Sequence, residues 1–308
     1  MPFLEARHVH KRYANHVALD DVSISVEQGK VFGLLGPNGA GKTSLIRIIN
    51  RITAPDKGEV LIEGKPLAAK DVSRIGYLPE ERGLYRKMKV GEQAIYLARL
   101  KGIDTATATA RLREWFDKFD IMPWWNKKVE ELSKGMQQKI QFVSTVIHEP
   151  ELLIFDEPFS GFDPVNADLL KAEILNLRDK GRTVIFSTHN MQSVEEVCDD
   201  IALVNSAHIV LNGSVEEIKR QHSEGLLKIV LESSDTLPQS YLDSLNILEY
   251  KTRGGRHTIR FRRPTGVHNQ EVIAGIPSSC NLLLFEEELP SMHDIFVKTV
   301  KNNTHEQQ

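Results

Sequence analysis

The sequence predicts an α/β fold in which a largely parallel sheet is covered by helices on both faces, followed by a second, smaller domain. Short apolar runs alternate with segments of helical periodicity over roughly the first two-thirds of the chain. These runs are apolar throughout, as expected for strands that are buried on both faces. The length of 308 residues, about twice a ~150-residue domain, favours two units.

The composition is that of an ordinary globular protein. It is 41% hydrophobic and 26% charged, with 39 basic and 42 acidic residues, which excludes a collagen, a disordered chain and a disulfide-rich scaffold. No run approaches the ~18 apolar residues that a membrane helix needs, so we expect neither a span nor a secretory signal. Cys198 and Cys280 lack paired spacing, which favours a reducing cytoplasm. The net charge of -3 argues against bulk binding to nucleic acid, and none is expected as a partner.

The first core strand and the helix after it flank a glycine-rich turn. Residues 31–35, Val-Phe-Gly-Leu-Leu, form the predicted strand. After the turn, Leu45, Ile48, Ile49 and Ile52 recur at i, i+3, i+4 and i+7, the spacing of a helix with one buried face. All four side chains are therefore expected in the core.

Two further strands follow the same pattern. Residues 152–155 form the second predicted strand. Asp163 then stands where an N-cap is expected, and Gly181 ends the helix that Asp163 begins. Residues 183–187 form the third strand, and residues 201–211 form an edge hairpin.

The pattern changes at two places along the chain. Between about residues 84 and 149 helical periodicity replaces the strand signals, which predicts a helical insert. Near residue 221 polar residues precede new short strands, so we divide the chain into domains 1–222 and 223–308, with a polar, frayed tail from Asn302. The new strands are expected at residues 227–231, 247–250, 258–262 and 282–285.

The turn after the first strand has the sequence of a phosphate-binding loop. Gly36-Pro-Asn-Gly-Ala-Gly-Lys-Thr43 fits G-x4-G-K-[ST], with the required strand before it and helix after it. Glycines let backbone N–H groups converge on phosphate oxygens, and the helix N-terminus adds its positive end. Lys42 is predicted to hold the β- and γ-phosphates and Thr43 to ligate Mg²⁺. The predicted contact residues are Gly36, Pro37, Asn38, Gly39, Ala40, Gly41, Lys42, Thr43 and Ser44.

Three side chains at the ends of the other buried strands complete a candidate catalytic site. Asp156 and Glu157 follow residues 152–155 directly. Asp156 is placed to hold Mg²⁺ through water, and Glu157 to polarise the attacking water as general base. His189 follows the third strand at the same sheet edge, where it can hydrogen-bond the γ-phosphate.

A further segment carries a resemblance to a known family. Leu132-Ser-Lys-Gly-Met-Gln-Gln138 resembles the signature LSGGQ of ABC transporter ATP-binding subunits at Leu132, Ser133 and Gly135. It departs from that signature at Lys134 and Met136, a substitution typical of the ABC-2 type branch that exports drugs and sodium. Ser133 also begins a helix, so a hydroxyl, backbone N–H groups and a helix dipole converge where an anion would bind.

Other family positions occur in the same order. Tyr13 stands where the family stacks an aromatic ring on adenine. Residues 160–163, Ser-Gly-Phe-Asp, resemble the D-loop, which crosses the dimer interface and places Asp163 beside the nucleotide. Residues 187–189, Ser-Thr-His, resemble the switch histidine segment. The resemblance extends over about residues 1–220.

One position departs from the family in a way that concerns the metal. Where the family usually has a glutamine that senses the γ-phosphate and Mg²⁺, residues 76–81 read Gly-Tyr-Leu-Pro-Glu-Glu. Glu80 cannot donate a hydrogen bond while it is ionised. It also adds negative charge beside Asp156 and Glu157, which should raise the dependence on Mg²⁺. We assign Glu80 to the metal site.

The resemblance implies a P-loop NTPase ABC cassette, with a RecA-like core, a helical subdomain and an N-terminal β-subdomain, followed by a small α+β accessory domain. It implies ATP and Mg²⁺ as cofactors and a second copy of the cassette as partner, most simply in a homodimer. Each ATP would lie between Lys42 of one subunit and Ser133 of the other. The helical insert, with Trp124 and Trp125, and residues 80–90 are where the family contacts its membrane permease.

We therefore expect an ATP-hydrolysing transport subunit that powers export of sodium ions or small hydrophobic compounds through a separately encoded permease. It would be cytoplasmic and held at the inner face of the cell membrane by that permease. The alternative is a soluble ABC ATPase of translation or DNA maintenance. The basic run from Lys251 to Arg263 is interpreted as the solvated face of a hairpin, with an anionic-lipid or nucleic-acid patch as the alternative.

Overall fold

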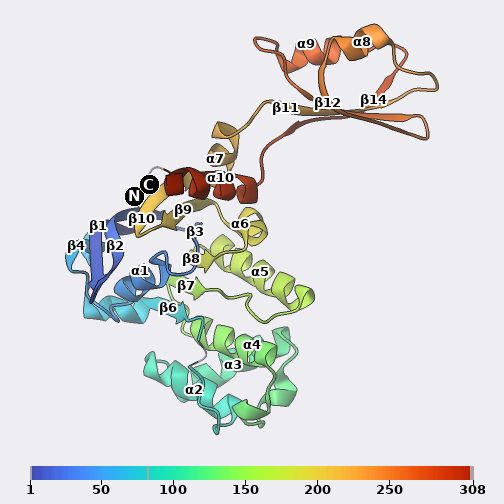
Figure 1. Cartoon of the computed structure of the whole chain (residues 1–308). Helices are drawn as coiled ribbons and strands as arrows, with labels where there is room; N and C mark the ends of the chain where they lie inside the picture. Colours follow the sequence, from blue (N-terminus) through green and yellow to red (C-terminus); the bar gives the residue numbers. More distant parts are fainter. Residues whose placement is uncertain (1, 82, 306–308) are drawn as a thin grey trace. The chain divides into compact units, whose positions relative to one another are not determined.

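The computed structural model describes residues 2–81 and 83–305 and separates into two compact units, residues 1–215 and 216–308 (Figure 1). The division falls at the start of helix α7 (Val215–Gln221), a few residues before the boundary expected at 222/223. Among the described helices, none is both long enough and apolar enough to cross a bilayer.

A six-stranded sheet forms the centre of the first unit, in the order β10-β9-β3-β8-β7-β6. The strands β6, β7, β8, β3 and β9 pair in parallel, and only β10 runs antiparallel, beside β9. The three predicted core strands and the edge hairpin are confirmed. The bounds are β3 (Val31–Leu35), β6 (Ile75–Leu78), β7 (Leu152–Asp156), β8 (Thr183–Thr188), β9 (Asp200–Asn205) and β10 (His208–Ser214).

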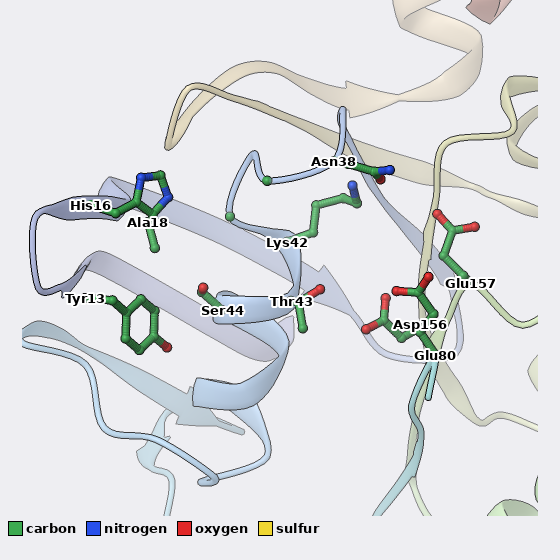
Figure 2. Close-up of a pocket in the computed structure, with 12 residues that line it drawn as sticks. Tyr13, His16, Ala18, Asn38, Lys42, Thr43, Ser44, Glu80, Asp156 and Glu157 are labelled. Atoms are coloured by element: carbon green, nitrogen blue, oxygen red, sulfur yellow. The ribbon is translucent and has the colours of Figure 1, made fainter. Parts of the chain in front are cut away.

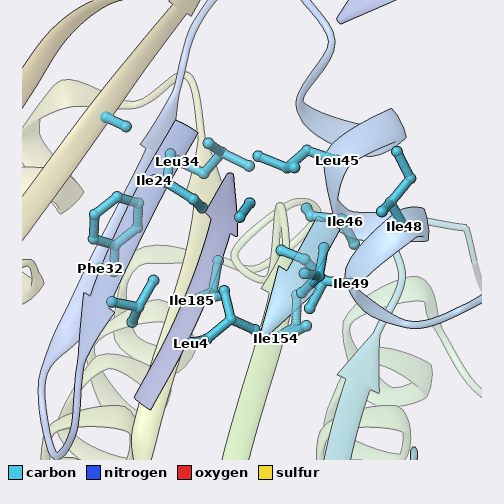
Figure 3. Packing of buried hydrophobic residues seen from close by; sticks show 14 of the residues in the cluster. Leu4, Ile24, Phe32, Leu34, Leu45, Ile46, Ile48, Ile49, Ile154 and Ile185 are labelled. Carbon is cyan, nitrogen blue, oxygen red and sulfur yellow. The ribbon is translucent and has the colours of Figure 1, made fainter. Parts of the chain in front are cut away.

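A second, four-stranded sheet forms the N-terminal β-subdomain, in the order β2-β1-β4-β5. Its apolar face and one face of the central sheet enclose helix α1 (Lys42–Ile49). Figure 3 shows Leu45, Ile46 and Ile49 of α1 packed with residues of both sheets. The bounds are β1 (Pro2–Tyr13), β2 (His16–Glu27), β4 (Lys57–Ile62) and β5 (Lys65–Pro66).

The predicted core face of α1 is right at three of its four positions. Leu45, Ile48 and Ile49 are buried, but Ile52 is 61% exposed, so its assignment to the core is wrong. The helix ends at Ile49, and Arg51 adopts a left-handed φ of 56°. The helical periodicity therefore stops before Ile52.

The opposite face of the central sheet is covered by α5 (Pro164–Asp179) and α6 (Met191–Val197). Every residue of β3, β7 and β8 is buried, as predicted for strands with both faces covered. The Asp163 carboxylate accepts from Asn166 N at 3.0 Å and caps α5, and Gly181 follows its C-terminus with φ of 82°.

A helical subdomain lies between β6 and β7 in the chain. It contains α2 (Val90–Leu100), α3 (Thr105–Lys118) and α4 (Lys134–Val146), with short 3₁₀ turns at Met122–Trp124 and Val129–Glu131. Another 3₁₀ turn, Ala69–Arg74, precedes β6. The Trp125 ring packs edge to face on Phe116 at 5.2 Å. A Cβ added at Gly91 would lie 2.4 Å from the same indole. Trp125 therefore packs within the helical subdomain.

The second unit is built on a four-stranded antiparallel sheet, in the order β12-β13-β11-β14. Helices α8 and α9 cover one face, where Leu227, Ile229, Ile259 and Phe261 are buried. Helix α10 continues to His305, past the expected start of the frayed tail; residues 306–308 lie outside the described residues. The bounds are β11 (Leu226–Glu232), α8 (Gln239–Asp243), β12 (Asn246–Arg253), β13 (Arg256–Arg262), α9 (Asn269–Ala274), β14 (Asn281–Glu288) and α10 (Met292–His305).

The basic run of this unit lies on a hairpin, and acids from neighbouring segments face it. Arg260 pairs with Glu288 at 2.7 Å and with Glu249 at 3.5 Å. Arg262 pairs with Glu224 at 3.3 Å. This arrangement matches the solvated hairpin face that the sequence predicts, and the acids that balance its charge come from other segments.

Candidate nucleotide-binding site

The candidate site lies at one edge of the central sheet. Since β3, β8, β7 and β6 are adjacent and parallel, the loops that follow them leave the sheet side by side. They border a pocket of about 320 Å³ (Figure 2). Its lining residues are Tyr13, His16, Ala18, Asn38, Gly39, Gly41, Lys42, Thr43, Ser44, Glu80, Asp156 and Glu157.

The phosphate loop needs glycine at two of its positions. Gly36 has φ of 143°, and a Cβ there would lie 2.1 Å from Val204 O. Gly41 has φ of 118°, and a Cβ there would lie 2.2 Å from Ala18 O. The loop is thus pressed against β9 and β2, and its backbone can turn toward a ligand only without side chains at these points.

Lys42 is held over the loop by carbonyl groups. Its Nζ donates to Gly36 O at 2.6 Å and to Pro37 O at 3.0 Å, and the residue is 7% exposed. Burial lowers the pKa of Lys42, while the charges of Glu157, Asp156 and Glu80 oppose that shift. A phosphate would give the ammonium charged acceptors in place of neutral carbonyls.

Asp156 is a buried carboxylate at the end of β7. It is 3% exposed and accepts a short hydrogen bond from Ser187 Oγ, its partner in the β7–β8 register. Burial raises the pKa of Asp156, and the Ser187 hydrogen bond opposes that rise. The neighbouring charges of Glu80 and Glu157 raise it further.

Glu157 is fixed by its backbone and by both carboxylate oxygens. It adopts a left-handed φ of 48°, which is costly for a residue with a side chain and is typical of functional sites. Its Oε1 lies 2.7 Å from His189 Nδ1, and its Oε2 accepts from Thr188 Oγ1 at 3.2 Å. The structure thus joins Glu157 to the predicted His189 and adds Thr188, which the sequence analysis missed.

Seven predicted residues do not line the pocket, namely Gly36, Pro37, Ala40, Ser133, Gly135, Asp163 and His189. Ser133 is exposed and caps α4, accepting from Met136 N at 3.3 Å. Gly135 lies against the D-loop segment, where an added Cβ would be 3.4 Å from Gly161 O. The Asp163 carboxylate is occupied by its own helix, and hydrogen bonds from Asn166 lower its pKa. Within one chain the site therefore lacks its predicted signature contacts.

The far end of the pocket is formed by Tyr13, His16 and Ala18. Tyr13 ends β1 and is 39% exposed, and the ammonium of Lys11 lies over its ring at 5.5 Å from the centroid. His16 and Ala18 come from the beginning of β2 and were missed by the sequence analysis. The feature that could have indicated His16 is the register of the β1–β2 hairpin, which pairs Tyr13 with His16.

The residues assigned to Mg²⁺ fit that ion in type and place. Thr43, Asp156 and Glu80 all line the pocket and offer one hydroxyl and two carboxylates. No group of three histidine, cysteine or acidic side chains forms a metal cage in the part of the chain that the structure describes. Mg²⁺ is usually held by one or two carboxylates plus substrate phosphates rather than by such a cage.

Comparisons with known proteins agree with this geometry. Residues 19–160 match the family described as ABC transporter, and residues 213–300 match the ATP-binding protein DrrA1-3-like, C-terminal domain. The uncharacterized ABC transporter ATP-binding protein YhaQ of Bacillus subtilis is 43% identical over 295 residues, which cover 95% of this chain and 97% of YhaQ. The chain belongs to the ABC transporter ATP-binding family.

Two further relatives extend the comparison. The daunorubicin resistance ATP-binding protein DrrA3 of Streptomyces coeruleorubidus is 30% identical over 230 residues, covering 74% of this chain and 73% of DrrA3. A solved ATP-binding subunit of an ABC transporter superposes with a TM-score of 0.66 at 30% identity, covering 71% of this chain and 92% of that one. Members of this ABC family bind ATP with Mg²⁺ and hydrolyse it to power transport. Membership therefore favours transport over translation or DNA maintenance.

The buried charge of Asp156 predicts a pH-dependent stability effect. Because its native pKa lies above the ordinary 3.8, the ionised carboxylate destabilises the folded chain at neutral pH. Asp156→Asn keeps an acceptor for Ser187 and should raise the unfolding free energy at pH 7. That gain should shrink as the pH falls through the native pKa toward 3.8. Thermal unfolding across pH measures it.

Asp163→Asn is the matched control, because its carboxylate is exposed and its pKa is lowered. It should give no gain at pH 7. If the wild-type chain were as stable as Asp156→Asn at neutral pH, the destabilisation assigned to the ionised Asp156 carboxylate would be contradicted.

Proposed function

We propose that this chain is the ATP-hydrolysing subunit of an exporter of small hydrophobic compounds or sodium ions, and that it acts on a separately encoded membrane permease. The proposal of ATP hydrolysis is supported by one observation: Lys42, Thr43, Asp156 and Glu157 line the same pocket. The export part is supported by the drug-resistance relative and by the match of the accessory domain to a DrrA1-3-like domain.

ATP would lie with its phosphates on the loop between β3 and α1 and its base against Tyr13. Backbone N–H groups of the loop and the α1 N-terminus bind phosphate oxygens, and Lys42 exchanges its bonds to Gly36 O and Pro37 O for the β- and γ-phosphates. Thr43, Asp156 and Glu80 would hold Mg²⁺. When bound, that ion offsets the charge of the phosphates beside the carboxylates.

Glu157 acts as the general base. A water beside the γ-phosphate gives its proton to the Glu157 carboxylate while its oxygen bonds to the γ-phosphorus. The bond from that phosphorus to the bridging oxygen of the β-phosphate breaks, so ADP is the leaving group and inorganic phosphate is released. Thr188 and His189 bind different oxygens of that carboxylate and fix its direction. Once ATP is bound, His189 would need both ring nitrogens protonated to donate to Glu157 and to the γ-phosphate at the same time.

A second copy of the chain completes each site in this proposal. Ser133 presents a hydroxyl and the N-terminus of α4 to solvent, which is an anion-binding arrangement. It does not line the nucleotide pocket of its own chain. ATP between Lys42 of one copy and Ser133 of the other would close a homodimer. Hydrolysis breaks that bridge and returns the open state, and the permease converts the difference into transport.

The cell-level part of the proposal is a cytoplasmic subunit held at the inner membrane face by its permease. Co-purification of the tagged chain from detergent-extracted membranes tests it, with sequencing of the integral protein that is retained. We expect a polytopic membrane protein at near-equal stoichiometry. A chain that retains none, or that is instead retained on ribosomes or DNA at physiological salt, would contradict the transport role.

The role of Glu157 predicts a variant that binds but does not turn over. Glu157→Gln keeps the side-chain shape and removes the base, so kcat should fall by about 10²–10⁴-fold while ATP affinity is kept. The variant should also accumulate as an ATP-bound dimer, which gel filtration with ATP detects. Glu59→Gln, an exposed acid outside the pocket, is the matched control. Normal turnover by Glu157→Gln would remove Glu157 from the base role.

A further inference from the structure

Ser187 is a buried serine near the end of β8, beside the two consecutive carboxylates of the nucleotide site. It is 0% exposed, and the three residues before it in the strand are apolar and equally buried. An apolar side chain would suit this position, because it brings no polar atom into the core. A hydroxyl here needs a hydrogen-bond partner, and the identity of that partner indicates what the serine does.

The partner of the Ser187 hydroxyl is Asp156. Ser187 Oγ donates to Asp156 Oδ1, and the register of β7 and β8 places the two residues opposite each other. Asp156 is 3% exposed, so this hydrogen bond lies in the protein interior. Within residues 2–81 and 83–305, no other side chain donates to this carboxylate. A buried carboxylate with one side-chain donor depends on that donor for its orientation.

The second oxygen of Asp156 is left for a ligand in the pocket. No group in the described part of the chain donates to Oδ2, and Asp156 lines the nucleotide pocket together with Thr43 and Glu80 (Figure 2). Mg²⁺ demands near-ideal octahedral geometry, so the direction of a carboxylate that holds it matters. The hydrogen bond from Ser187 therefore fixes Asp156 through one oxygen and leaves the other for the metal.

Ser187 also binds the backbone of the neighbouring acid. Glu157 N donates to Ser187 O at 3.0 Å, at the point where Glu157 adopts its left-handed φ of 48°. One residue of β8 thus contacts both acids, Asp156 through its hydroxyl and Glu157 through its carbonyl. The relative placement of the two carboxylates is set at Ser187.

The next hydroxyl of β8 binds the other carboxylate. Thr188 Oγ1 accepts from Asn190 N at 3.0 Å, so its own proton is directed elsewhere, and it donates to Glu157 Oε2 at 3.2 Å. Ser187 and Thr188 are adjacent in sequence but donate to different acids. This division matches the different roles assigned to Asp156 and Glu157, metal binding and proton transfer.

We propose that Ser187 is a positioning residue for the metal, whose hydroxyl holds the Asp156 carboxylate in the direction from which it binds Mg²⁺ through water. The proposal rests on the proposed function, since it deepens the role assigned to Asp156. Ser187 does not line the pocket, so it acts only through the residues that do. Removing a group that hydrogen-bonds a metal ligand typically weakens metal affinity or activity by about 10- to 100-fold.

The test compares nucleotide binding with and without the metal. A fluorescent, non-hydrolysable ATP analogue is titrated into the full chain in Mg²⁺ and in EDTA, and the ratio of the two Kd values gives the Mg²⁺ enhancement. Ser187→Ala should lower this enhancement by at least ~10-fold. Its Kd in EDTA should stay that of the wild type, because the phosphate loop binds the phosphates without Asp156. The Mg²⁺ concentration for half-maximal ATP hydrolysis should rise in parallel.

Three further variants separate this role from packing. Ser187→Thr restores a hydroxyl and should keep the Mg²⁺ enhancement. Thr188→Val removes the donor of Glu157 and should lower kcat while the enhancement is kept. Thr183→Val is the matched control, since it removes a buried hydroxyl from the opposite end of β8, where Thr183 Oγ1 accepts from Gly29 N at 3.1 Å. It should keep the enhancement.

Each outcome of these titrations decides one part of the account. Wild-type enhancement in Ser187→Ala would overturn the proposal and leave ATP hydrolysis by this chain intact. A wild-type chain without any Mg²⁺ enhancement would instead contradict the metal site of the proposed function. If Thr183→Val loses the enhancement as fully as Ser187→Ala, the loss comes from packing and the proposal fails. It also fails if Ser187→Thr loses the enhancement while its thermal unfolding is unchanged.

Discussion

The strands β3, β8, β7 and β6 run parallel in adjacent positions, and the nucleotide site depends on that pairing. It brings the phosphate loop, Asp156, Glu157 and Glu80 to one sheet edge, although these residues come from distant parts of the sequence. The register between β7 and β8 also pairs Asp156 with Ser187, which gives the buried carboxylate its hydrogen-bond donor. The fold thus sets both the position and the ionisation of the site.

The charges at this edge are unbalanced in the free chain. One buried lysine faces three carboxylates, and the pKa of Asp156 is raised by burial and by its acidic neighbours. The left-handed backbone at Glu157 adds local strain. The central sheet and the buried core around α1 hold the site in place against this charge imbalance and strain.

Structural features that depend only on residues close together in the sequence could be predicted. The core strands, the phosphate loop and the N-caps at Ser133 and Asp163 follow from local spacing, and the structure confirms these local features. Ile52 was placed wrongly, because the left-handed turn at Arg51 leaves no local signal in the apolar periodicity. His16 and Thr188 depend on how strands pair in space, which one sequence does not reveal.

In the proposed dimer each ATP lies between the phosphate loop of one chain and Ser133 of a second copy. Disulfide trapping tests this most directly, with Cys280 replaced by serine and the Glu157→Gln change included to prevent hydrolysis. One tagged copy carries Asn38→Cys in the phosphate loop, and a differently tagged copy carries Ser133→Cys. We predict an ATP-dependent disulfide that joins the two tags. If ATP leaves the copies unlinked, or if both cysteines placed in a single chain link within that chain, the shared site is contradicted.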